Sequence, residues 1–219
     1  MVLYFFGRGI WYPFFLKIKG KESIESVNKK NEKNILKNLQ SLLKNKKLSL
    51  PFDKITLIAL KDERVLELWV KNNQKFIYFK SYPFTAFSGE LGVKLKEGDK
   101  QIPEGIYKVE YLNPNSSYHL SIKINYPNEF DRVKAKEENR KNLGGDIFIH
   151  GKSSTVGCIP IGDKAIEELF YIVSKTNKKN IKVIISPYDM RIKKINLKNS
   201  TINWYDNLLK NIKTQISFF

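Results

Sequence analysis

Residues 144–163 read GGDIFIHGKSSTVGCIPIGD. The apolar run before His150 predicts a strand that ends at this histidine, and a short polar loop leads on to Cys158, the only cysteine of the chain. A thiolate needs a nearby base or positive charge to form near neutral pH, and an imidazole can accept that proton. Either residue alone is more often structural, because a single cysteine usually behaves as a small buried hydrophobe. Together, with glycines beside both, they favour a cysteine nucleophile.

The glycines of this stretch suit acyl chemistry. Gly157 allows the backbone to approach an acyl carbonyl closely, so the amides of Gly157 and Cys158 are candidates for an oxyanion hole. Gly151 exposes a main-chain carbonyl that can hold one tautomer of the imidazole, the role that a carboxylate plays in other triads. The segment therefore predicts Cys158, His150 and Gly151 as catalytic residues.

Composition limits the alternatives. The chain has 219 residues, 42% of them hydrophobic, enough for one large domain with a sizeable core. One cysteine excludes an intramolecular disulfide framework and a multi-cysteine zinc site, and two histidines leave little material for other metal chemistry. No stretch approaches the roughly 20 apolar residues of a transmembrane helix. We expect neither a metal nor another cofactor.

The basic charge first suggests nucleic acid. There are 39 Lys and Arg against 22 Asp and Glu, a formal charge of +17. However, 34 of the basic residues are scattered lysines and only five are arginines, the residue that grips phosphates and base edges bidentately. We interpret the charge as a solvated basic surface with a diffuse attraction to polyanions such as acidic lipids or wall polymers, and regard nucleic-acid binding as the weaker hypothesis.

Periodicity predicts an α+β chain with a β-rich centre and helices at both ends. Helical spacing marks residues 21–47, 165–173 and the region of Leu208, Leu209, Ile212 and Ile216, and Asp163 is expected to cap the second helix. A long loop rich in glycine is expected over 88–105. The predicted strands are 54–60, 65–70, 76–87, 106–112, 118–124, 147–150 and 181–185.

Several spaced motifs resemble one family. The pattern of His150-Gly151 followed by Gly157-Cys158, after an Ile-Pro-Glu-Gly loop, is similar to the L,D-transpeptidase catalytic domain, also called the YkuD domain, and closest to its YafK-like branch. The other motifs that carry the resemblance are AFSGELG (86–92), KEGDKQ (96–101), YHLS (118–121), YPN (126–128) and SPYDMR (186–191).

The resemblance implies a division of the chain and a chemistry. Residues 1–50 would form an aromatic segment and helical extension, 51–191 the L,D-transpeptidase-like catalytic domain, and 192–219 a basic helical tail. The family acts on peptidoglycan stem peptides through a cysteine acyl-enzyme, without a metal. It places Cys158 as nucleophile, His150 as general base, Gly151 as the orienting carbonyl, and Gly157 with Cys158 at the oxyanion hole.

Three departures accompany the resemblance. Val156 stands where the broader family has histidine, Pro160 replaces a polar residue, and the spacing from His150 to Cys158 is short. These features suit the YafK-like branch, in which hydrolysis of L,D-amide bonds, as an L,D-carboxypeptidase or by release of wall-attached lipoprotein, stands beside transpeptidation. The alternatives are a non-catalytic wall-binding or scaffold protein and a basic nucleic-acid-binding protein.

Further candidates are substrate-binding residues, each with a structural alternative. Arg191 is expected either to clamp a stem-peptide carboxylate or to close the last strand with a salt bridge. Glu90 and the other acidic residues of the long loop are expected either to meet the ammonium of a diamino acid or to lie in solvent. The full candidate set is His119, Thr155, Arg191, Ser88 and Glu90.

The resemblance also implies a location. Peptidoglycan lies outside the cytoplasm, so we expect a protein of the bacterial cell envelope, in the periplasm. The first 20 residues are apolar and aromatic but lack the ordered pattern of a secretory signal. They are compatible with a start that lacks an upstream signal, or with a segment packed on the domain or at a membrane surface.

Overall fold

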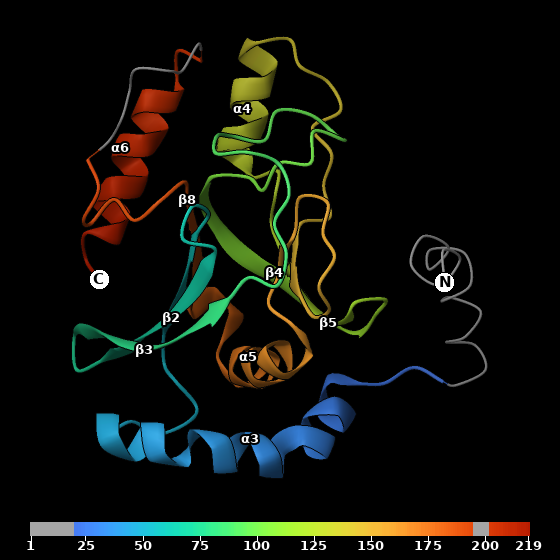
Figure 1. Ribbon diagram of the computed structural model, residues 1–219, viewed down its shortest axis with the longest axis vertical. Coiled ribbons are helices and arrows are strands. Elements are labelled where there is room, and N and C mark those ends of the chain that lie inside the picture. Colours follow the sequence, from blue (N-terminus) through green and yellow to red (C-terminus); the bar gives the residue numbers. More distant parts are fainter. Residues whose placement is uncertain (1–19, 195–201) are drawn as a thin grey trace.

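The computed structural model describes residues 20–194 and 202–219, which form one mixed eight-stranded sheet flanked by helices (Figure 1). The aromatic segment expected before residue 20 lies outside the described residues. The strand order is β3-β2-β1-β8-β4-β5-β6-β7. The strands are β1 (Ile55–Leu60), β2 (Val65–Asn72), β3 (Lys75–Pro83), β4 (Gly105–Ser116), β5 (His119–Ile124), β6 (Phe148–His150), β7 (Ile159–Pro160) and β8 (Ile181–Ser186).

Each face of the sheet has its own hydrophobic core. On one face, α5 (Asp163–Lys175) packs between the sheet and α3 (Ile24–Lys46), as Figure 1 shows. On the other, α6 (Tyr205–Ile216) covers a second cluster through Leu208, Leu209, Ile212 and Ile216. The alternation of side chains along the strands supplies both clusters: Val183 and Ile185 of β8 belong to the first, and Ile184 to the second. Among the described residues, no helix is both long and apolar enough to span a bilayer.

The α+β architecture expected from the sequence is confirmed, including the helices before and after the β-rich centre. Two local expectations are wrong. Asp163 does not cap α5: Gly162 holds the cap position without a side-chain hydrogen bond, and the Asp163 carboxylate instead accepts the backbone N–H of Lys152 at 2.8 Å. Helix α4 (Glu129–Glu137), which starts with a reciprocal capping box between Asn128 and Asp131, was not expected.

Candidate active site

His150 ends β6, in the interior of the sheet. Antiparallel pairing with β5 places it opposite Ser121, and parallel pairing with β7 places it opposite Pro160. Its side chain is buried, and Nδ1 lies 2.6 Å from the carbonyl oxygen of Gly151. A carbonyl only accepts, so Nδ1 carries the proton and Nε2 presents its lone pair. The ring of Tyr118 packs against the imidazole with a centroid separation of 4.6 Å.

Only glycine fits at position 151, because the surrounding atoms leave no room for a side chain. A Cβ atom there would lie 2.6 Å from Oδ1 of Asp163 and 2.7 Å from the carbonyl oxygen of Tyr118. Any larger residue would therefore push the backbone away from α5 or β5. The close packing fixes the carbonyl that orients His150.

Cys158 immediately precedes β7 and is half-buried. Its thiol donates to the carbonyl oxygen of Asp146, with Sγ 3.5 Å from the oxygen. The hydroxyl of Thr155 accepts the Cys158 N–H at 2.9 Å and donates to the Cys158 carbonyl at 2.8 Å, so one side chain closes the turn before Cys158.

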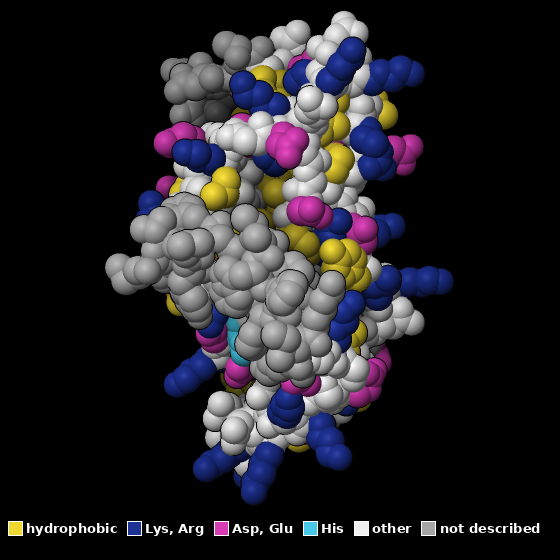
Figure 2. Space-filling view, turned by 90° about the vertical axis from the view of Figure 1, so that its right-hand side faces the viewer, with side chains coloured by type: hydrophobic (Ala, Val, Ile, Leu, Met, Phe, Trp, Pro, Cys, Tyr) yellow, Lys and Arg dark blue, Asp and Glu magenta, His cyan; other side chains and the backbone are white. Residues whose placement is uncertain are grey.

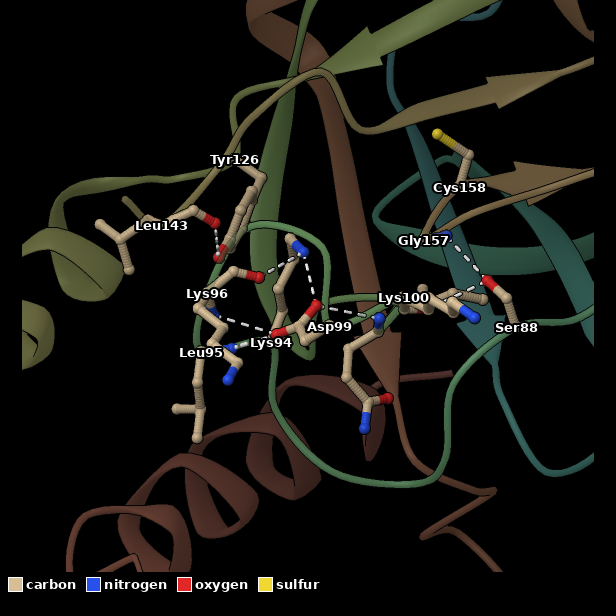
Figure 3. A network of polar contacts seen from close by, with 12 residues as sticks. Ser88, Lys94, Leu95, Lys96, Asp99, Lys100, Tyr126, Leu143, Gly157 and Cys158 are labelled. Carbon is tan, nitrogen blue, oxygen red and sulfur yellow. Dashed lines mark hydrogen bonds and ion pairs between the residues drawn. The ribbon is translucent and has the colours of Figure 1, made fainter. Parts of the chain in front are cut away.

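Gly157 is fixed from the opposite side, by the long loop. Its φ of 87° and a Cβ position 2.9 Å from the carbonyl oxygen of Gln101 both demand glycine. Its N–H donates to Oγ of Ser88 at 2.7 Å, and Ser88 donates in turn to the carbonyl of Lys100 at 3.0 Å. Figure 3 shows this bridge, with the Cys158 sulfur pointing away from it.

A cavity of about 320 Å³ brings together His150, Thr155 and Cys158. Gly151 and Gly157 adjoin it through the backbone. Tyr118 and Asp146 also line this cavity, although sequence reasoning gave neither a role. The signal in the sequence was proximity to His150 for Asp146, and the YHLS motif (118–121) for Tyr118.

The remaining four predicted substrate-binding residues are not part of this cavity, and each has another contact. His119, with a φ of 75°, directs Nε2 to Glu167 of α5 at 2.7 Å, which makes the structural alternative the better description. Arg191 binds Asp189 and Glu67, so the salt-bridge alternative is favoured over a carboxylate clamp. Ser88 braces Gly157, and Glu90 is exposed beside Gln101.

The long loop is organised by buried charge. Asp99 accepts hydrogen bonds from Lys94 Nζ at 2.6 Å and from the backbone N–H groups of Leu95, Lys96 and Gln101 (Figure 3). Although burial opposes the effect, these hydrogen bonds lower the pKa of Asp99. The turn that presents Lys100 and Gln101 to the nucleophile segment is thereby fixed.

A second, fully buried ion pair fixes the two ends of the same loop. Lys61 Nζ lies 2.8 Å from Oε1 of Glu104 and also donates to the carbonyls of Gly92 and Ile102. Tyr205 of α6 donates to the other Glu104 oxygen at 2.6 Å. Glu104 is thus a buried anchor, and neither alternative expected for the acidic residues of the long loop, contact with a substrate ammonium or exposure to solvent, describes it.

Burial keeps both reactive groups neutral. It raises the pKa of the Cys158 thiol to about 11 and lowers the pKa of His150 to about 4, despite the hydrogen bond to Gly151 that acts the other way. Near neutral pH the free protein therefore holds a thiol and a neutral imidazole. A thiolate at Cys158 would therefore form at this pH only if another group accepted the thiol proton.

The lowered pKa of His150 predicts a loss of stability in acid. The unfolded chain, in which the pKa is about 6.5, binds a proton more readily than the folded chain with its value of about 4. The stabilisation is complete above pH 6.5 and is lost as the pH falls towards 4, by about 3 kcal/mol. Urea denaturation between pH 4 and 7 should show this slope in the wild type and a flatter one in His150→Asn. Parallel curves for the two proteins would contradict the assignment.

The Thr155 turn gives a stability prediction. We expect Thr155→Val to lower the free energy of unfolding by about 1–3 kcal/mol, because the Cys158 N–H loses its acceptor. Thr155→Ser keeps the hydroxyl and should stay close to the wild type. Chemical denaturation of the three proteins measures the difference. Equal losses for Val and Ser would show that the methyl group matters instead of the hydrogen bonds.

Comparison with known proteins places this geometry in a family. The model of the L,D-transpeptidase catalytic domain, YkuD, matches residues 53–185. YafK of Escherichia coli (strain K12), provisionally named an L,D-transpeptidase, is 30% identical over 164 residues, which are 73% of this chain and 63% of that protein. The E. coli O157:H7 protein of the same name matches equally. The chain therefore spans less than two thirds of the length of these curated relatives.

The fold has a counterpart among solved structures. The helical cell shape determining protein Pgp2 from Campylobacter jejuni superposes with a TM-score of 0.52 at 22% identity, over 63% of this chain and 49% of that one. The family match covers the strand that carries His150, the loop to Cys158 and the sheet that supports both. This chain belongs to the L,D-transpeptidase catalytic domain family, the YkuD family.

Proposed function

We propose that the protein catalyses cysteine-dependent acyl transfer on L,D-amide bonds of peptidoglycan stem peptides. One observation carries the proposal: the hydrogen bond from Nδ1 to Gly151 leaves Nε2 of His150 as a proton acceptor on a ring that lines the same cavity as Cys158. Membership of the family supplies the substrate class.

The chemistry follows from these groups. As the Cys158 sulfur attacks the amide carbonyl, Nε2 of His150 takes the thiol proton and returns it to the leaving amine. A thioester remains on Cys158. Water then releases a free carboxylate, or the amine of a second stem peptide forms a new amide. The first outcome includes trimming of stem peptides and release of wall-attached lipoprotein, and the second is transpeptidation.

In the proposed mechanism, the hydrogen bonds made by the amides of the oxyanion hole have to rearrange when substrate binds. The N–H groups of Gly157 and Cys158 already donate to Ser88 and Thr155. An acyl oxyanion would attract both amides more strongly than a neutral hydroxyl does, because hydrogen bonds to charged acceptors are stronger. We therefore propose that substrate displaces these hydroxyls from the amides.

The test uses defined substrates: tetrapeptide, cross-linked dimer and protein-linked muropeptides, analysed by mass spectrometry. The wild type is expected to convert at least one of them through a covalent adduct on Cys158, and Cys158→Ala is expected to convert none. Identical products from both proteins on every substrate would refute the proposal. The products also separate hydrolysis from transpeptidation.

A non-catalytic wall-binding protein is the second candidate. It is favoured by the resting state of the thiol, which is neutral and donates to the Asp146 carbonyl. Such a protein would retain muropeptides on a Cys158→Ala variant as well as on the wild type, and neither would form an adduct. The mass of the intact protein after incubation therefore distinguishes the two candidates.

The proposed substrate implies the cell envelope, in the periplasm, as the place of action. Figure 2 shows Lys and Arg side chains dispersed over the face in view, with Asp and Glu between them. A dispersed basic surface suits peripheral contact with anionic lipids or wall polymers. Nucleic acid is a weaker partner, and absence of binding to DNA and RNA at low salt would exclude it.

A further inference from the structure

A second cavity, larger than the catalytic one, lies elsewhere in the fold. Its volume is about 380 Å³, and it opens beside β4, β8 and the first turn of α4. It shares no lining residue with the cavity of Cys158. We call it the basic groove because four lysines line it: Lys54, Lys108, Lys179 and Lys182.

The sheet holds three of these lysines close together. Lys108 of β4 and Lys182 of β8 are direct partners in the antiparallel register. Lys54 immediately precedes β1, whose Ile55 pairs with Ile181, the neighbour of Lys182. Like charges placed directly opposite each other in a sheet are destabilising. The fold therefore maintains an arrangement that costs stability.

No carboxylate neutralises this cluster within residues 20–194 and 202–219. None of the four lysines forms an ion pair there, and Glu129 is the one acidic residue that lines the groove. Lys182 is half-buried and donates only to the neutral Oε1 of Gln215, at 2.8 Å. Burial, and then the charge of Lys54, lower the pKa of Lys182. Within the described residues, four lysines of the groove thus face a single carboxylate, that of Glu129, and none of them is ion-paired with it.

We propose that the basic groove binds a phosphate-type oxyanion with two or more negative charges. Lysines supply point charges without the planar fork of arginine, so the site selects for charge density more than for a planar shape. The volume admits a pyrophosphate or a phosphate with its substituent. The proposal is independent of catalysis at Cys158, because the two cavities are separate.

The experiment compares two variants of equal charge. Lys108→Gln/Lys182→Gln removes two charges from the groove, and Lys29→Gln/Lys33→Gln removes two from exposed positions on α3. Isothermal titration calorimetry with pyrophosphate at about 0.15 M ionic strength, where long-range attraction is screened, measures affinity. We expect the groove variant to bind at least about tenfold more weakly, and the α3 variant to bind like the wild type.

Thermal melting provides a second, independent test of the proposal. Relief of the like-charge pair should raise the Tm of the free groove variant by about 1–3 °C. Pyrophosphate should raise the Tm of the wild type and of the α3 variant by the same amount, and that of the groove variant by less. A second arm with vesicles that contain phosphatidic acid, a phosphate monoester that can carry two negative charges, distinguishes a lipid phosphate from a soluble one. Equal weakening of both variants, or no pyrophosphate binding by the wild type, would overturn the proposal.

Discussion

His150→Asn is expected to slow formation of the Cys158 thioester by about 10²- to 10⁴-fold, the range that a positioned general base contributes. The buried thiol, with a pKa near 11, is almost fully protonated at neutral pH, so attack depends on a group that removes its proton. Asparagine offers no comparable base. The measurement is the rate at which the acyl adduct appears on the intact protein in a single turnover with excess enzyme.

The chain offers a matched control in its other histidine. His119→Asn changes the same residue type, and asparagine tolerates the positive φ at this position. Because His119 binds Glu167 outside the catalytic cavity, we expect its rate to stay within about threefold of the wild type. If both substitutions slowed acylation equally, His150 would not be the specific base.

Lys61→Met is expected to lower the free energy of unfolding by about 3–5 kcal/mol. The substitution leaves the Glu104 carboxylate buried without its cation, and deprives the carbonyls of Gly92 and Ile102 of a donor. This is a large share of the typical stability of a domain, about 5–15 kcal/mol. Urea denaturation measures the loss, and hydrogen exchange of the loop over 88–104 should increase first.

Two further variants serve as controls for this prediction. Lys80→Met breaks an ion pair with Glu168 that is a third exposed on the lysine side, and should cost less than about 1 kcal/mol. Lys61→Met with Glu104→Gln removes both charges and should recover part of the loss. A Lys61→Met variant as stable as Lys80→Met would show that the buried pair is not essential to the loop.

Local patterns in the sequence predicted most of the fold. Apolar patterning predicted the hairpin of β1 and β2, the strand ending at His150 and the helix through Leu208 and Ile216. Strand β1 is buried on both faces and reads as a continuous apolar run, whereas β2 and α6 each bury one face. The sequence analysis did not predict helix α4, because this helix buries only Ala135 and shows almost no apolar stripe. Its available signal was the spacing of Asn128 and Asp131, a capping box in which Asp stands in for Glu.

The site was predictable only where chemistry is local in sequence. His150, Gly151 and Cys158 lie within nine residues, and the structure places the two reactive side chains in one cavity. The functions of Ser88, Asp99 and Lys61 depend on partners 69, 5 and 43 residues away, respectively. Of the three, only Asp99 has a partner near enough to suggest a contact. For His119 and Arg191 the sequence left a substrate-binding and a structural role open, because a motif shows residue type but not the direction of a side chain; the contacts with Glu167 and with Asp189 and Glu67 favour the structural role.

The pairing of β6 with β7 has a consequence for the loop that connects the two strands. Ile149 pairs with Ile159 and His150 with Pro160, so hydrogen bonds between strands set the base and the nucleophile at adjacent sites. The loop between the two strands is exposed at Ser153 and Ser154, where an insertion or deletion would not disturb the core. A longer or shorter loop there would leave the pairing of β6 with β7 unchanged. The number of residues between His150 and Cys158 therefore does not by itself set how close the two side chains lie.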